Sequence, residues 1–306
     1  SGPPALRPRR PRADNARPMT GPDPPTADLD ARVADAVRAV RARTGLVPRV
    51  GLTLGSGLGG VVEALDDAVV LPTAELPHWP RSTVPGHAGR LALGHWRGVP
   101  LVALAGRSHR YEGYPLDRVT FAVRVLHALG ARTLLFTNAV GATNPEFQAG
   151  DLMLATDHVN FIGKRGLLTP AELAGRRGTR ASGAPGRELA GPYSPRLRAA
   201  LRSAAARAGV RLLQGTLLGG LGPAYETAAE VRMAADLGAD VACMSTVHEV
   251  TLAAQLGAEV ASLSCVTNRA TGLSAGPLDH AEVTEVADRV AASLRRILEE
   301  FLEAGA

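Results

Sequence analysis

Short apolar strands alternate with amphipathic helices through most of this chain, and this alternation limits the possible folds more than any other feature of the sequence. We expect strands over 49–54, 90–95, 100–105, 132–137, 151–156, 211–218, 240–244 and 259–267, and helices from Asp28 to a stop at Gly45 and over 115–129, 195–208, 226–237, 246–256 and 280–303. Glycine, the residue that most often ends a helix, follows several of these helices. The pattern predicts an α/β fold: a single domain with a central mixed, mainly parallel β-sheet flanked by helices.

The first 25 residues differ from the rest of the chain in composition. They contain eight prolines and almost no large apolar side chains, so burial cannot offset the entropy of ordering them. We therefore expect a disordered Pro/Arg-rich N-terminal tail over 1–25 and one folded domain over 26–306. Arginines in this tail account for most of the formal net charge of +5. The body is then close to neutral, which argues against nucleic acid as a partner.

Several classes of protein are disfavoured by what the sequence contains. There is no uncharged apolar run of about 18 residues, and the basic N-terminus lacks the apolar stretch of a secretory signal. We therefore expect a cytoplasmic protein with no membrane partner. Cys243 and Cys265 are too far apart for a zinc or redox motif, which favours reduced, buried thiols. His248 and Glu249 do not form an HExxH motif, and we expect no metal.

A glycine-rich segment over 55–60 follows the first expected strand and precedes an expected helix. Backbone N–H groups in such a loop can approach an anion, and phosphate fits this position. The segment also satisfies GxGxxG, with Glu75 at about the spacing that a dinucleotide site requires, so a nicotinamide-dependent oxidoreductase is an alternative. Pro72 interrupts the stretch before Glu75 and weakens that alternative. A glycine turn needed only for packing is the third interpretation.

A second polar segment comes directly after the strand expected over 100–105. In extended chain Arg107, His109 and Tyr111 share one face, because side chains alternate along a strand. A guanidinium fork beside an imidazole suits a phosphate anion. The position after the carboxyl end of a strand, where open α/β sheets bind ligands, favours this interpretation over a solvated turn.

Four further side chains have both a functional and a structural interpretation. Glu226 could accept a hydrogen bond from a base, beside Tyr225 as an aromatic wall, or it could act only as an acid in the first turn of a helix. Ser245 and Asn268 follow expected strands, and they could be an N-cap and a turn residue instead of ligands. His280 opens the last helix, where a surface histidine is the alternative.

Taken together, these motifs resemble the trimeric purine nucleoside phosphorylases. The matching strings are LGSGLGG from Leu54, STVPGHAGRL from Ser82, GRSHRYEGYP from Gly106, TNAVGATNP from Thr137, GPAYETAAE from Gly222, MSTVHEV from Met244 and VTNRATG from Val266. They follow the family's order and spacing over residues 45–302. The resemblance implies reversible phosphorolysis of (deoxy)inosine and (deoxy)guanosine to the free base and (deoxy)ribose 1-phosphate, a reaction of purine salvage.

The resemblance also assigns roles by position. It implies that phosphate is bound by Ser56, His87, Arg107, His109, the backbone of Ala139, and Ser245; ribose by Tyr111, Met244 and His280; and the base by Tyr225, Glu226, Met244 and Asn268. Catalysis is implied for Asn268, Glu226, His280 and His109. The family uses no metal or organic cofactor, inorganic phosphate is the co-substrate, and neighbouring subunits of a homotrimer complete each other's pockets.

The chemistry of glycosidic cleavage agrees with this assignment. Positive charge develops on the sugar and negative charge on the departing purine, so the enzyme should place phosphate against the first and hydrogen-bond donors against the second. Asn268 can donate to O6 and accept from a protonated N7, while Glu226 accepts from N1–H. This pairing suits hypoxanthine and guanine better than adenine, whose N1 is an acceptor.

The chain departs from the family pattern at several positions. His248 stands where the family usually has proline, Cys243 where glycine is common, and Val140 where a small alanine is usual. The segment 163–194, expected to be a lid, a functional loop or disordered, lacks the family's asparagine-proline-leucine stretch and the phenylalanine that reaches the adjacent subunit's ribose pocket. Two neighbouring functions stay open: a methylthioadenosine phosphorylase, which the base-site residues disfavour, and a nucleoside-binding protein with reduced activity.

Overall fold

The computed structural model describes residues 27–55, 59–84, 87, 89–163, 191–273 and 280–305, and it places nine strands in one sheet. The strands are β1 (Val50–Leu54), β2 (Asp66–Pro72), β3 (Arg90–Trp96), β4 (Val99–Ala105), β5 (Thr133–Ala142), β6 (Leu152–Asn160), β7 (Leu212–Gly219), β8 (Val241–Cys243) and β9 (Glu259–Arg269). Their order is β2-β3-β4-β1-β5-β8-β7-β6-β9, and β9 also pairs with β5. The second half of the sheet therefore closes into a ring.

The pairings confirm a mixed sheet in an α/β domain. Strands β1 and β4, β1 and β5, β5 and β9, β6 and β7, and β7 and β8 are parallel. Strands β2 and β3, β3 and β4, β5 and β8, and β6 and β9 are antiparallel. Parallel pairs therefore outnumber antiparallel pairs only slightly in the described part of the chain.

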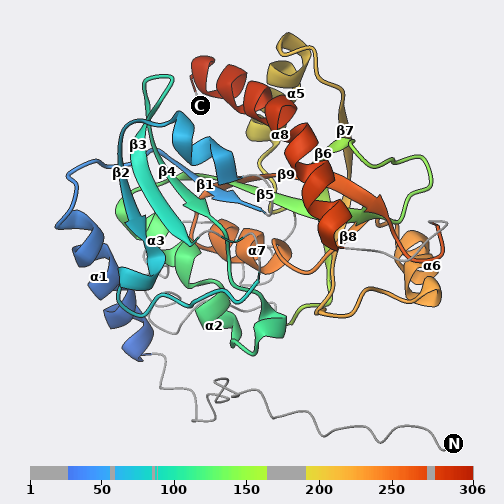
Figure 1. Cartoon of the computed structure of the whole chain (residues 1–306), viewed down its shortest axis with the longest axis horizontal. Helices are drawn as coiled ribbons and strands as arrows, with labels where there is room; N and C mark the ends of the chain where they lie inside the picture. Colours follow the sequence, from blue (N-terminus) through green and yellow to red (C-terminus); the bar gives the residue numbers. More distant parts are fainter. Residues whose placement is uncertain are drawn as a thin grey trace, which may run out of the picture.

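Helices cover both faces of the sheet (Figure 1). The helices are α1 (Ala27–Arg41), α2 (Leu116–Val119), α3 (Phe121–Leu129), α5 (Pro195–Arg207), α6 (Ala228–Asp236), α7 (Val247–Gln255) and α8 (His280–Glu303). Apolar side chains of α1, α3 and α7 form one core with the sheet, and those of α5 and α8 form a second core on the other face. The carboxyl ends of β1, β4, β5 and β9 are fixed between these two layers.

The chain between β1 and β3 differs from the sequence prediction. The helix expected after the glycine-rich loop is only a short 3₁₀ helix, η1 (Gly59–Ala64). It leads into β2, a strand that the sequence interpretation missed because two aspartates begin it and much of it is exposed at the sheet edge. Glu75 then lies in a second 3₁₀ helix, η2 (Thr73–Glu75). This connection is not a βαβ unit, so it removes the structural basis for the dinucleotide alternative.

Three of the expected helices also differ from the sequence prediction. The helix expected over 115–129 is divided at Thr120, whose hydroxyl donates to the carbonyl of Leu116 at 2.7 Å. Such back-bonding offers the backbone an alternative partner and bends helices. The first helix ends at Arg41, before the expected stop at Gly45, and α6 begins at Ala228, two residues later than expected.

Two expectations lie mainly or wholly outside the described residues. The tail over 1–25 is not described, and neither is most of the segment 163–194. None of the helices that the structure describes has both the length and the apolar character needed to cross a membrane.

Candidate active site

One cavity at the carboxyl ends of the central strands brings together most of the predicted site residues. Its lining includes His87, Arg107, His109, Tyr111, Ala139, Tyr225, Glu226, Met244, Ser245 and Asn268. These residues come from segments far apart in the sequence, so the sheet is what gathers them. Ser56 lies outside the described residues; His280 begins α8, and its side chain is not described.

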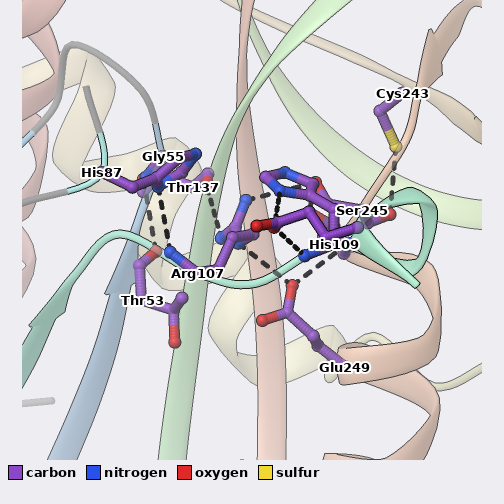
Figure 2. Close-up of polar contacts among 11 residues, drawn as sticks. Thr53, Gly55, His87, Arg107, His109, Thr137, Cys243, Ser245 and Glu249 are labelled. Atoms are coloured by element: carbon purple, nitrogen blue, oxygen red, sulfur yellow. Dashed lines mark hydrogen bonds and ion pairs between the residues drawn. The ribbon is translucent and has the colours of Figure 1, made fainter. Parts of the chain in front are cut away.

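Arg107 is fixed at one end of the cavity by contacts to three other segments (Figure 2). One terminal nitrogen donates to the carbonyl of Thr137 at 2.8 Å, and the other donates to Oγ of Ser245 at 3.2 Å. Its Nε lies 3.3 Å from a carboxylate oxygen of Glu249. Each terminal nitrogen carries a second N–H, so the guanidinium can still present two donors to an anion.

A glycine turn makes this placement possible. Gly106 follows β4 with φ of 101°, a conformation that side chains rarely adopt, and a Cβ there would lie 2.9 Å from Cβ of His87. The turn lets Nδ1 of His87 accept a hydrogen bond from the backbone N–H of Arg107 at 2.9 Å. In the neutral ring of His87, Nε2 therefore carries the proton.

Three rings form a row beside Arg107. The centroids of His87 and His109 are 5.1 Å apart, and the ring of His109 is stacked on Tyr111 at 4.7 Å. Burial raises the pKa of Tyr111 to about 12, so its hydroxyl stays protonated at neutral pH and can donate a hydrogen bond. The row presents imidazole and phenol groups to the same cavity.

Glu112 holds both the backbone and the ring of His109 in place. One carboxylate oxygen of Glu112 lies 3.2 Å from Nδ1 of His109 and accepts from its backbone N–H at 2.6 Å, while the other accepts from the backbone and hydroxyl of Thr83. Burial alone would raise the pKa of Glu112, but the hydrogen bonds from His109 and Thr83 lower it to about 2. The ionised carboxylate can only accept, so Nδ1 of His109 holds the ring proton.

This environment makes a pH-dependent contribution of Glu112 to stability. Because the pKa of Glu112 in the folded protein is lowered from 4.5 to about 2, its ionised form stabilises the fold above pH 4.5, and this contribution is lost as the pH falls towards 2. We expect Glu112→Gln to lower the melting temperature at neutral pH and to differ less from the wild type in acid. Melting curves across this range measure the effect, with the exposed Glu146→Gln as a control. A melting difference for Glu112→Gln that is the same at every pH would contradict it.

Glu226 and Asn268 lie in the wall of the same cavity, together with Tyr225. Burial raises the pKa of Glu226. The amide of Asn268 donates to the carbonyl of Arg269 at 3.0 Å and accepts from the hydroxyl of Thr267 at 2.9 Å. It retains a second N–H and a second lone pair, so it can serve a ligand as donor and acceptor together.

The loop before α6 brings Met244 and Tyr111 close together. Gly222 has φ of 64°, and any Cβ at this position would collide with the Met244 side chain and approach the Tyr111 ring to 3.0 Å. Glycine is therefore required for this approach of backbone to side chains. Two of the three residues predicted to contact ribose, Tyr111 and Met244, therefore lie against the loop that leads to Glu226.

The structure contradicts the non-functional interpretations that the sequence left open for three residues. Thr246 caps α7, so Ser245 is not the N-cap and its hydroxyl contacts Arg107 instead. Glu226 precedes the cap of α6 at Thr227 and is not in the first turn of that helix. Asn268 lies within β9 and is not a turn residue.

Two acidic residues of the site received no role from the sequence. Glu112 and Glu249 were present in the matching strings, but their contacts to His109 and Arg107 are visible only in the fold. Glu112 lies three residues after His109, and Glu249 lies three residues after Thr246. In both cases the earlier residue directly precedes a helical turn. For Glu249 the Thr-x-x-Glu capping-box spacing was a usable signal that this carboxylate turns back towards the helix start.

Two further expectations from the sequence concern metal ligands and cysteines in the described residues. There, no group of three His, Cys, Asp or Glu side chains is placed to hold a metal ion. Cys243 and Cys265 are both free and buried, as expected, and burial raises the pKa of the Cys243 thiol to about 11.

Comparison with known proteins defines the family. A model described as the phosphorylase superfamily matches residues 49–303. Purine nucleoside phosphorylase 1 of Geobacillus stearothermophilus is 40% identical over 251 residues, which are 82% of this chain and 89% of that protein. Purine nucleoside phosphorylase of Bos taurus is 40% identical over 271 residues, 86% of this chain and 91% of that protein. A crystal structure of a schistosoma purine nucleoside phosphorylase in complex with hypoxanthine matches with a TM-score of 0.81 and 31% identity, covering 90% of this chain and 98% of that one.

The chain therefore belongs to the phosphorylase superfamily and, within it, to the purine nucleoside phosphorylases.

Proposed function

We propose that this enzyme cleaves (deoxy)inosine and (deoxy)guanosine with inorganic phosphate, releasing the purine base and (deoxy)ribose 1-phosphate. The observation that carries the proposal is one cavity lined both by side chains suited to bind an anion, Arg107, His109 and Ser245, and by side chains suited to read a base, Glu226 and Asn268. Phosphorolysis needs these two chemistries on either side of a ribose. The structural relative that contains hypoxanthine, a 6-oxopurine, supports the same class of base.

The phosphate end supplies donors to the attacking anion. Two N–H groups of Arg107 and the hydroxyl of Ser245 can bind its oxygens, and Ala139 lines the same cavity. Because Nδ1 of His109 is held by Glu112, Nε2 is the ring atom left for the ligand. It accepts from a protonated phosphate oxygen, or donates to an unprotonated one when the ring is charged. In both arrangements one proton lies between His109 and phosphate.

The base end stabilises the leaving group. As a phosphate oxygen forms its bond to C1′ of the ribose, the bond from C1′ to N9 breaks and its electrons pass to the purine, where a proton taken up from solvent at N7 neutralises them. Asn268 accepts from that N7–H and donates to O6, while ionised Glu226 accepts from N1–H. We propose that inorganic phosphate is the co-substrate and faces the positive charge that develops on the sugar, while these side chains stabilise the negative charge on the base. We also propose that no metal or organic cofactor takes part.

The direct test is hypoxanthine release from inosine with and without inorganic phosphate. We expect turnover only when phosphate is present, with ribose 1-phosphate as the second product. Equal turnover in phosphate-free buffer, with ribose as the product, would identify a hydrolase. Methylthioadenosine, supplied in parallel, tests the related alternative: faster cleavage of that nucleoside would reject our assignment of the base.

We also propose a homotrimer, on the basis of the family resemblance. Light scattering of the full chain should give a mass near three times 31.7 kDa. A monomer with full phosphorolytic activity would reject this part of the proposal and leave the reaction assignment intact.

A further inference from the structure

Arg107 has a buried neighbour of opposite charge that no step of the proposed reaction uses. Glu249, in the first turn of α7, places Oε2 3.3 Å from Nε of Arg107 (Figure 2). The two side chains are only 3% and 4% exposed. A carboxylate this close to an anion-binding arginine opposes the binding of any anion, so its presence needs an explanation.

Glu249 is held in place by its own helix. The same Oε2 accepts a hydrogen bond from the backbone N–H of Thr246 at 3.1 Å. Thr246 has φ of 67°, an unusual conformation for a β-branched residue, and it precedes α7 directly. The start of its own helix therefore directs the carboxylate towards the guanidinium.

The hydrogen bonds that orient Arg107 come from residues other than Glu249. Its terminal nitrogens are already bound by the carbonyl of Thr137 and the hydroxyl of Ser245. Its Nε, by contrast, makes no hydrogen bond, so the contact to Glu249 is an ion pair without hydrogen-bond alignment. Glu249 thus contributes mainly its charge, and Thr137 and Ser245 contribute the geometry.

We propose that Glu249 is the built-in counter-ion of Arg107: it stabilises the site when no anion is bound and weakens the binding of phosphate. A buried guanidinium without a counter-charge is strongly unfavourable, and Glu249 supplies that charge in the empty enzyme. When phosphate binds, it supplies the same charge, and Glu249 then repels it. This inference rests on the proposed phosphate site at Arg107.

The test replaces the charge and keeps the shape. Glu249→Gln retains an oxygen that accepts from the N–H of Thr246. We expect calorimetric titration with inorganic phosphate to show binding about tenfold tighter than in the wild type, because a neighbouring negative charge at low effective dielectric has been removed. Without phosphate the variant should melt at a lower temperature, and saturating phosphate should close this gap.

Two control variants separate charge from helix capping. Glu249→Asp keeps the carboxylate, so its phosphate affinity should stay within about threefold of the wild type, a difference well under 1 kcal/mol. Glu230→Gln makes the same substitution at the equivalent position of the capping box of α6, where the residue is exposed. It should leave phosphate affinity unchanged.

The outcomes distinguish this inference from the proposed function. A wild type that shows no phosphate binding and no phosphate-dependent turnover would reject the proposed function. A wild type that binds phosphate, with a Glu249→Gln variant that binds it equally or more weakly, would overturn the counter-ion role alone. The Glu249→Gln variant could be insoluble. In that case, soluble protein obtained with excess phosphate, or with Arg107→Met as a second substitution, would support the counter-ion role. Insolubility under both conditions would overturn it.

Discussion

Arg107→Met should raise the KM for phosphate by roughly 10- to 150-fold, the equivalent of 1.5–3 kcal/mol for losing a charged hydrogen-bonded contact. The guanidinium is the only arginine group in the cavity lining of the described residues, and its terminal nitrogens are oriented by Thr137 and Ser245. Methionine has a similar length but no donor and no charge. The KM for inosine at saturating phosphate should change far less, because the base contacts lie at Glu226 and Asn268.

The control for this variant must separate charge from geometry. Arg107→Lys keeps the charge but cannot provide two donors in one plane, so its phosphate KM should lie between those of the wild type and Arg107→Met. Because Arg107→Met leaves Glu249 buried without its partner, the double variant Arg107→Met/Glu249→Gln should melt at a higher temperature than the single variant. Steady-state kinetics in which Arg107→Met leaves the phosphate KM unchanged would remove Arg107 from the anion site.

The sequence predicted the class of fold because alternation of strands and helices follows from local patterns. It placed most strands to within a few residues, including β1, β4 and β9. It missed β2, since a half-exposed edge strand that begins with Asp66 and Asp67 has no continuous apolar run. It also expected an unbroken helix across Thr120, because the hydroxyl bond that divides the helix leaves no mark on hydrophobic periodicity.

The candidate site shows a similar division between local and long-range information. Most residues singled out from the motifs line one cavity: Arg107 and Ser245 come just after strands, Asn268 lies within β9, and the sheet brings these segments together. The partners that orient them were not predictable from the motifs. Glu249 lies 142 residues after Arg107, and only the packing of α7 against the sheet brings the two side chains together. Side-chain pairing across such distances is a property of tertiary structure.

Asn268→Asp should shift the choice of base from inosine towards adenosine. In the proposed complex the Asn268 amide donates to O6, and an aspartate would instead place an acceptor against that oxygen. An unpaired buried polar group costs about 1–3 kcal/mol, and more when it is charged, so turnover of inosine and guanosine should fall steeply. The carboxylate can accept from a 6-amino group. Adenosine should therefore gain relative to inosine by roughly 10- to 100-fold, at about 1.4 kcal/mol per factor of ten.

Two features of the structure limit the gain in absolute rate. One side-chain oxygen of the aspartate would face the carbonyl of Arg269, to which the amide now donates at 3.0 Å, so the new side chain must shift. Glu226 would still face the unprotonated N1 of adenine unless one of the two takes up a proton, and burial already raises the pKa of Glu226. Adenosine turnover should accordingly stay modest even as the ratio changes.

The quantity to measure is the ratio of kcat/KM for adenosine to that for inosine, at one phosphate concentration, in the wild type and in Asn268→Asp. Asn268→Ala is the matched control, because it removes the donor without adding a carboxylate. It should lower inosine turnover without creating a partner for the 6-amino group, so its ratio should rise less than that of Asn268→Asp. An Asn268→Asp ratio no higher than that of the wild type would show that Asn268 does not read position 6 of the purine, and the base-site assignment would then be wrong.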